Sequence, residues 1–278
     1  MEINGARVRY LRTGSGPPLV LLHGLLGYSF SWRFTIPALS PYASVFAPDM
    51  MGAGFSDPPP GHDHSLSATA RLVQQFAGQL GLSSFDLLGT SRGGAVAMLA
   101  AAEALSVPSR PQVNRLVLVA PVNPFSSHGR RLAPFVGSYF GSACFRFLIP
   151  HMSVLYPYWH ARMYGDRNNI PYDSLAGYLA PLLRPGAFDH PLGIVRNWSR
   201  DLRELTTALP KLSGFQALLM WGGNDPAVYA SSAKPLAQFF SNSRTVIFPG
   251  IGHLPYEECP REFNRALIEF LTGAKSKL

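Results

Sequence analysis

The chain contains few cysteines, few charged residues and no long apolar run. Its two cysteines, Cys144 and Cys259, belong to no CxxC or Cys/His cluster in the 278 residues. A disulfide framework and a structural zinc site are therefore excluded, and a reducing compartment is the default. Only 14% of the residues are charged and 47% are apolar, so disorder and coiled coil do not fit. No uncharged apolar stretch approaches the ~18 residues that cross a bilayer.

Basic charge is present but dispersed. The 24 Lys+Arg residues exceed the 16 Asp+Glu residues, yet no basic run is longer than Arg130-Arg131, so we expect no nucleic-acid partner. The first residues lack the basic and apolar segments of a secretion signal. We therefore expect a cytoplasmic protein without stable membrane insertion. The final residues, Ser276-Lys277-Leu278, match a peroxisomal address that would apply only in a eukaryotic host, and we favour a chance match.

Short apolar runs alternate with segments of helical spacing in the first part of the chain. Such alternation predicts a parallel sheet covered on both faces by helices. The expected strands are Arg7–Thr13, Pro18–Leu22, Ser44–Pro48, Phe85–Leu88 and Arg115–Ala120, and the expected helices are Ser67–Leu80 and Ser91–Leu105.

The pattern changes between residues 125 and 209. This segment shows no clear strand, holds 14 of the 33 aromatic residues and contains helical fragments broken by prolines. Strand patterns return at Phe215–Trp221 and Arg244–Phe248, before a final helix at Pro260–Leu271. We predict an α/β fold with a mostly parallel central sheet, formed by residues 1–124 and 210–278. Residues 125–209 would form an inserted helical cap.

The sequence Gly89-Thr90-Ser91-Arg92-Gly93 fits G-x-S-x-G between an expected strand and an expected helix. That context is the one a nucleophile elbow requires, because the tight turn lifts the serine hydroxyl above the sheet. A Cβ at Gly89 or Gly93 would collide with the neighbouring strand or helix. The alternative is a glycine-rich turn in which Ser91 only caps the helix.

Two further residues have the types that a serine nucleophile needs. His253 and Asp225 each follow an expected strand, and the order Ser91, Asp225, His253 is that of the α/β-hydrolase arrangement. The alternatives are that Asp225 only caps a turn before Pro226 and that His253 only hydrogen-bonds its loop. Acyl transfer also needs donors for the oxyanion, and we expect the backbone amides of Arg92 and Leu25 in that role.

These motifs together resemble the α/β-hydrolase superfamily, in its capped epoxide-hydrolase-like or esterase-like branch. The resemblance implies Ser91 as nucleophile, His253 as base and Asp225 as the residue that orients it. It also implies structural or entrance roles for Asp49 and the Gly52–Asp57 loop. The residues that carry it are His23-Gly24, Asp49–Asp57, Gly89–Gly94, Asp225, Gly252-His253 and Glu258-Cys259-Pro260.

Departures from the patterns of individual families narrow the chemistry. Epoxide hydrolases and haloalkane dehalogenases place an aspartate where Ser91 stands. The His23–Gly27 sequence, HGLLG, differs from the HGGPG of proline iminopeptidases and from the GPG-containing version of C–C hydrolases. Arg92 would either contact an anionic substrate group or pack away beneath the cap, and we favour the second.

We therefore predict a serine hydrolase that cleaves a carboxylic ester or thioester of a small, mostly apolar molecule through an acyl-enzyme on Ser91. The alternatives are a C–C bond or lactone hydrolase and a non-hydrolytic ligand receptor, because one scaffold hosts many chemistries. We expect no cofactor and no metal, and the oligomeric state stays open. Residues 125–209 hold nine Arg against five Asp+Glu, so a basic outer face of the cap is expected.

Overall fold

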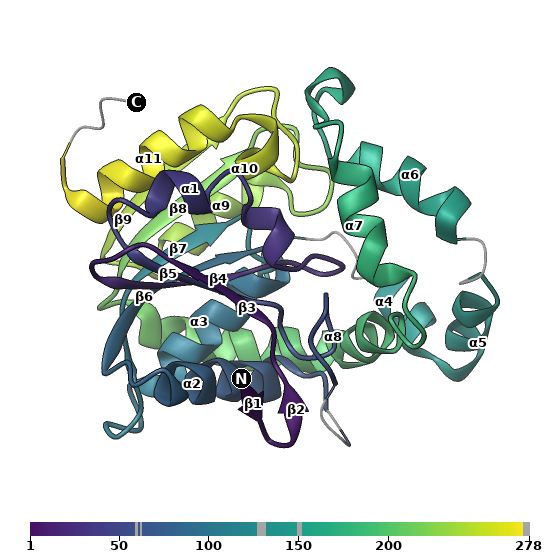
Figure 1. Ribbon diagram of the computed structural model, residues 1–278, viewed down its shortest axis with the longest axis horizontal. Coiled ribbons are helices and arrows are strands. Elements are labelled where there is room, and N and C mark those ends of the chain that lie inside the picture. Colours follow the sequence, from purple (N-terminus) through teal and green to yellow (C-terminus); the bar gives the residue numbers. More distant parts are fainter. Residues whose placement is uncertain (59–60, 62, 127–131, 149–151, 275–278) are drawn as a thin grey trace.

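A seven-stranded sheet forms the centre of the protein in a computed structural model that describes residues 1–58, 61, 63–126, 132–148 and 152–274 (Figure 1). The strand order is β3-β5-β4-β6-β7-β8-β9. All neighbours pair in parallel except β3 and β5, which confirms the expected mostly parallel sheet. The strands are β3 (Tyr10–Thr13), β4 (Pro18–Leu22), β5 (Ser44–Pro48), β6 (Ser84–Thr90), β7 (Gln112–Val119), β8 (Gln216–Gly222) and β9 (Asn242–Phe248).

The first expected strand is wrong as a single element. The chain forms β2 (Ala6–Arg7), which pairs with β1 (Glu2–Ile3) in a small separate sheet, and then begins again as β3. Between them the amide of Arg9 donates to the side chain of Ser56 instead of to a strand. A hydrogen bond to a loop 47 residues away therefore interrupts the strand that the local sequence pattern predicts as continuous.

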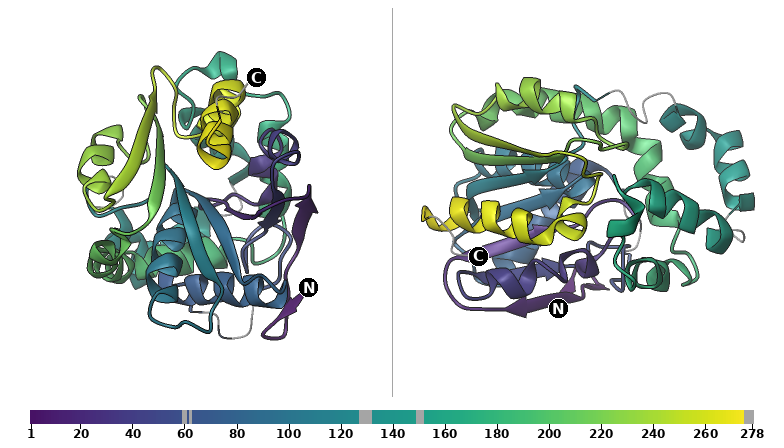
Figure 2. Two further views of the ribbon diagram at one scale, coloured as in Figure 1. Left: turned by 90° about the vertical axis from the view of Figure 1, so that its left-hand side faces the viewer. Right: turned by 90° about the horizontal axis from the view of Figure 1, so that it is seen from above.

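Helices cover both faces of the sheet because its central strands are apolar on both sides. In β7, Leu116 and Leu118 face one core cluster, whereas Val117 and Val119 face the other. The first cluster packs under α2 (Leu66–Gln79), α3 (Arg92–Ala104) and α9 (Ala233–Ala237), and the second under α1 (Ile36–Leu39), α10 (Pro255–Glu258) and α11 (Pro260–Thr272) (Figure 2).

Every described element between residues 125 and 209 is helical. The helices α4, α5, α6 and α7 lie at one end of the molecule (Figure 1). The last helix, α8, returns to the sheet, where Leu205 and Ala208 join the core cluster of α2 and α3. The bounds are α4 (Leu132–Gly137), α5 (Tyr139–Leu148), α6 (Met152–Arg162), α7 (Ser174–Leu182) and α8 (Asp189–Ala208); single 3-10 turns are Ser29–Trp32, Arg167–Asn169, Leu209–Leu212 and Ala230–Ser232.

The parallel strands bring their carboxyl ends to one edge of the sheet. The loops that follow β4, β6, β8 and β9 carry Gly24, Ser91, Asp225 and His253 in turn. Ligand sites of open α/β sheets lie at this edge. In the described part of the chain, no helix combines the length and apolar character that a bilayer span requires.

Candidate active site

Ser91 occupies a tight turn between β6 and α3. Its backbone has φ 52° and ψ −119°, a left-handed conformation that a non-glycine residue keeps only where its surroundings enforce it. A Cβ at Gly89 would overlap the carbonyl oxygen of Gly93, and a Cβ at Gly93 would overlap that of Leu22. Both glycines are therefore required by close backbone approach, as the motif predicts.

Asp225 and His253 form a buried hydrogen-bonded pair. The Nδ1 of His253 lies 2.8 Å from Oδ2 of Asp225, so Nδ1 donates to the carboxylate and the other ring nitrogen is left to accept. The second carboxylate oxygen accepts from the amides of Ala227, at 2.7 Å, and Val228, at 2.9 Å. Asp225 is thus held on both oxygens and orients the imidazole.

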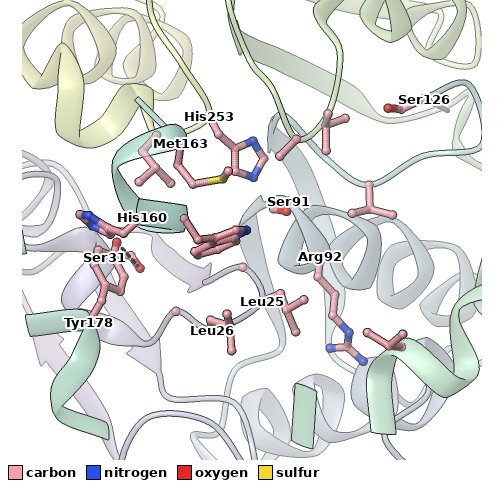
Figure 3. Close-up of a pocket in the computed structure, with 18 of the residues that line it drawn as sticks. Leu25, Leu26, Ser31, Ser91, Arg92, Ser126, His160, Met163, Tyr178 and His253 are labelled. Carbon is pink, nitrogen blue, oxygen red and sulfur yellow. Dashed lines mark hydrogen bonds between the residues drawn. The ribbon is translucent and has the colours of Figure 1, made fainter. Parts of the chain in front are cut away.

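Ser91 and His253 face the same cavity, which has a volume of about 370 Å³ (Figure 3). Leu25 and Leu26 line it from the loop after β4. Most of the remaining wall is aromatic or aliphatic and comes from the inserted helices, with Val136 of α4, Tyr156, Trp159 and His160 of α6, Met163 just beyond α6, Tyr178 of α7, and Val195, Trp198 and Leu202 of α8. The cavity therefore lies between the sheet edge and the insertion.

Two backbone amides beside Ser91 are available as donors. Leu25 and Arg92 both line the cavity, and within the described residues neither amide donates to a protein acceptor. A Cβ at Gly24 would lie 3.1 Å from the Cβ of Ser91, so glycine lets the loop after β4 come this close. This is the arrangement that an oxyanion hole requires.

Comparison with known proteins agrees with the fold. Residues 17–143 match the family model described as alpha/beta hydrolase fold. The solved epoxide hydrolase CorEH superposes with a TM-score of 0.84 at 22% identity, covering 98% of this chain and 96% of that one. The chain belongs to the α/β-hydrolase superfamily.

Several curated relatives of this chain are named as hydrolases. It is 28% identical to the putative hydrolase LipZ of Mycobacterium tuberculosis, over 94% of this chain and 91% of that protein. It is 39% identical to N-formylmaleamate deformylase of Pseudomonas putida over 135 residues. That second match spans 48% of each chain, so the hydrolase covers about half of this relative's length.

The side chain of Arg92 extends away from Ser91 (Figure 3). Its Nη2 donates to the carbonyl of His64, at 2.8 Å, and to Oγ1 of Thr69, at 3.1 Å, which is the packing that we favoured from sequence. Burial lowers its pKa to about 10, so it stays charged at neutral pH. Within the described residues its Nε and Nη1 have no hydrogen-bond partner, and no carboxylate forms an ion pair with it.

Asp49 holds the Gly52–Asp57 loop, for which the resemblance implies a structural or entrance role. Its buried carboxylate accepts from the amides of Ser29 and Phe55 and from Nη1 of Arg9. A second cavity of about 350 Å³ lies between residues 52–58 and residues 181–191, and shares Leu26 and Gly27 with the first. The loop therefore borders a space that adjoins the candidate site.

Glu257 is a buried residue that sequence reasoning missed. Its carboxylate accepts from the hydroxyls of Tyr164, Ser174 and Tyr178 in the insertion and from the guanidinium of Arg33 in the core. Burial, reinforced by the charge of Glu257, raises the pKa of both tyrosines, which therefore stay protonated and donate. The only signal in the sequence is its position four residues after His253.

The neighbouring Glu258 ties the insertion to the same loop. Its Oε1 accepts from the amide of Asp166 at 2.8 Å, and its Oε2 accepts from Gly165 at 3.0 Å and Gly252 at 2.7 Å. The resemblance included Glu258 without assigning it a role. Its role in the structure is to join the loop before His253 to the chain after α6.

Three remaining observations concern metal ligands, the cysteines and the last residues of the chain. In the described residues, no group of three His, Cys, Asp or Glu side chains could hold a metal ion. Cys144 and Cys259 are free thiols. The terminal Ser276-Lys277-Leu278 lies outside the described residues.

Proposed function

We propose that this hydrolase cleaves a carboxylic ester or thioester of a small, mostly apolar substrate through an acyl-enzyme on Ser91. One observation carries the proposal: the strained Ser91 and the Asp225-paired His253 face one cavity with largely apolar walls. Hydrolytic relatives support the reaction class. Serine at the elbow, where epoxide hydrolases and haloalkane dehalogenases have aspartate, favours acyl transfer over their chemistry.

The reaction would proceed in two halves. The Oγ of Ser91 attacks the carbonyl carbon while the free ring nitrogen of His253 accepts its proton. The amides of Leu25 and Arg92 stabilise the oxyanion, at about 3 kcal/mol per donor. Collapse expels the alcohol or thiol, which takes the proton from His253. A water molecule then attacks the acyl-enzyme in the same way and releases the acid.

The apolar side chains that the insertion contributes to the cavity favour a substrate with an apolar acyl group. We take residues 125–209 as a cap, because side chains of α6 and α8 line the same cavity as Ser91. Ligand sites of this kind are mostly apolar with few polar groups. Each methylene buried against such a wall contributes ~0.8 kcal/mol, which is about fourfold in kcat/KM.

The test combines active-site labelling with a substrate series. A fluorophosphonate probe should label wild type and fail on Ser91→Ala. The kcat/KM for nitrophenyl esters from acetate to decanoate should rise about fourfold per methylene and then level off when the cavity is full. Ser91→Ala, purified identically, measures background hydrolysis. A series that falls steadily from acetate, or activity on peptide amides only, would contradict the substrate assignment.

The same experiment separates the alternative functions. Labelling of Ser91 without turnover of any ester would favour cleavage of a lactone or a C–C bond, or a receptor that binds its ligand without hydrolysing it. Turnover of lactones or of dienoic ketones then distinguishes the first two from the third.

A further inference from the structure

The exposed large apolar side chains of the protein concentrate on the helices α4, α5 and α6. Eight of the 18 large hydrophobic side chains exposed among the described residues lie between positions 135 and 159. Figures 1 and 2 show these helices at one end of the molecule. We call the eight side chains the aromatic face: Phe135, Tyr139, Phe140, Phe147, Val154, Leu155, Tyr158 and Trp159.

The aromatic face follows the helical repeat. On α6, Leu155, Tyr158 and Arg162 are exposed at spacings of three and four residues, so they share one helix face. On α5, Phe140 and Phe147 are exposed seven residues apart. Tyr139 is 95% exposed. Soluble domains rarely expose apolar groups of this size together unless the surface contacts a partner.

The charge of this region has one sign. The sequence contains no Asp or Glu between Glu103 and Asp166, whereas residues 125–165 hold four arginines. One of them, Arg162, is exposed at the end of α6. The chain as a whole carries a net charge of +8. A partner of this surface must therefore have an apolar part that covers the aromatic rings and negative charge that attracts the basic side chains.

The same helices reach the candidate active site. Trp159 is 40% exposed and also lines the cavity of Ser91, as do Val136 of α4 and Tyr156 of α6. A partner seated on the aromatic face would therefore lie next to the wall of the cavity.

A phospholipid surface satisfies these conditions and a second copy of the chain does not. In a two-fold dimer through this face, Arg162 would meet a surface to which residues 104–165 of the other copy contribute no carboxylate. A bilayer offers an apolar interior that can cover the rings and, when its headgroups are anionic, attraction for the exposed Arg162. Amphipathic helices with aromatic and arginine side chains bind such interfaces without spanning them.

We propose that the aromatic face docks onto a membrane surface that contains anionic phospholipid. Docking is peripheral, involves the helices α4–α6, and places the cavity next to the lipid. The proposal does not depend on the reaction at Ser91, because it concerns a surface of the insertion.

Vesicle flotation with the full-length chain tests this surface. Vesicles of phosphatidylcholine with about one-third phosphatidylglycerol should bind at least tenfold more protein than phosphatidylcholine alone, and raising the salt should weaken binding. Tyr139→Ser/Phe140→Ser should reduce binding at least tenfold. The matched control is Tyr42→Ser/Leu105→Ser. It replaces two exposed apolar side chains outside the insertion and should bind as wild type does.

A charge substitution keeps the test valid if the double variant misfolds. Arg162→Gln should weaken binding about fivefold, whereas Arg261→Gln, at an exposed position on α11, should leave it unchanged. The proposal is overturned if anionic and neutral vesicles bind equally, or if both control variants lose binding as strongly as their test variants. Dimerisation that Tyr139→Ser/Phe140→Ser abolishes, without vesicle binding by wild type, would assign the face to a second copy instead.

Discussion

The backbone amide of His253 donates a 2.6 Å hydrogen bond to the carbonyl oxygen of Met163. This contact joins the loop of the candidate base directly to the insertion, 90 residues earlier in the chain. Met163 also lines the cavity, so the position of His253 and the shape of the cavity depend on the same contact. The insertion therefore contributes both to the wall of the cavity and to the position of the candidate base.

Ser91→Ala should lower kcat on a nitrophenyl ester at least about 10³-fold, because Oγ is the attacking atom. His253→Ala should have a similar effect, since the hydroxyl then keeps its proton. Steady-state kinetics measures both, and unchanged thermal midpoints would show that the fold persists. Ser106→Ala, at an exposed serine after α3, is the control. More than a tenth of wild-type turnover in Ser91→Ala would rule out the nucleophile assignment.

Asp225→Asn should slow turnover by about 10²–10⁴-fold. The amide oxygen can still accept from Ala227 and Val228, but the amide nitrogen then faces Nδ1 of His253. Two donors cannot pair, so the imidazole adopts the wrong tautomer or turns away. Fluorophosphonate labelling should slow in parallel while the thermal midpoint changes little. Wild-type labelling and turnover in this variant would remove Asp225 from the mechanism.

Glu257→Gln should reduce the unfolding free energy by about 1–3 kcal/mol, because it removes the buried charge that accepts from Tyr164 and Tyr178. Arg33 loses one of its two carboxylate partners and keeps Asp173. Urea unfolding measures the loss. The control is Glu262→Gln, an exposed glutamate at the start of α11, for which we expect a change within about 0.5 kcal/mol. Equal effects of the two substitutions would show that the Glu257 cluster does not secure the insertion.

Gly165→Ala should raise KM and lower kcat together. Its new Cβ would overlap the carbonyl oxygen of Gly250, which forces the insertion away from the loop of His253. Gly214→Ala is the matched control, since no atom lies within 4 Å of a Cβ there. Initial rates across substrate concentrations measure both effects. Identical kinetics of Gly165→Ala and Gly214→Ala would contradict close packing of the insertion against the loop of His253.

Asp201→Asn should stabilise the protein at neutral pH. Burial raises the pKa of Asp201 to about 6, so the native state binds this proton more tightly than the unfolded chain does. The unfolding free energy therefore falls as pH rises from about 4 to 6, and the cost is fully present above pH 6. We expect the variant to exceed wild type by up to about 3 kcal/mol at pH 7.5 and by less at pH 4.5. Urea unfolding at both pH values checks this, and an equal difference at both would contradict it.

Several elements could be predicted because their signals are local. The runs Pro18–Leu22 and Ser44–Pro48 are the strands β4 and β5 with the expected bounds, since each is a short apolar run that ends at a polar residue. Gly89 and Gly93 indicated the turn because only glycine fits such close backbone approach. Ser91, Asp225 and His253 each follow a strand. Because parallel strands end at one edge of the sheet, the sequence predicted that these residues would lie near one another. Local pattern and chain order were sufficient for these features.

Other features depended on contacts between distant parts of the chain. Nothing around Glu257 indicates that its carboxylate is buried among Arg33, Tyr164 and Tyr178, which lie 224, 93 and 79 residues away. The direction of the Arg92 side chain likewise depended on acceptors at His64 and Thr69. By itself the sequence determined the sheet and the turn at Ser91, because steric limits and periodic burial act over a few residues. Only the tertiary structure decided how the insertion meets His253, because that seam is built from hydrogen bonds whose partners are far apart in the chain.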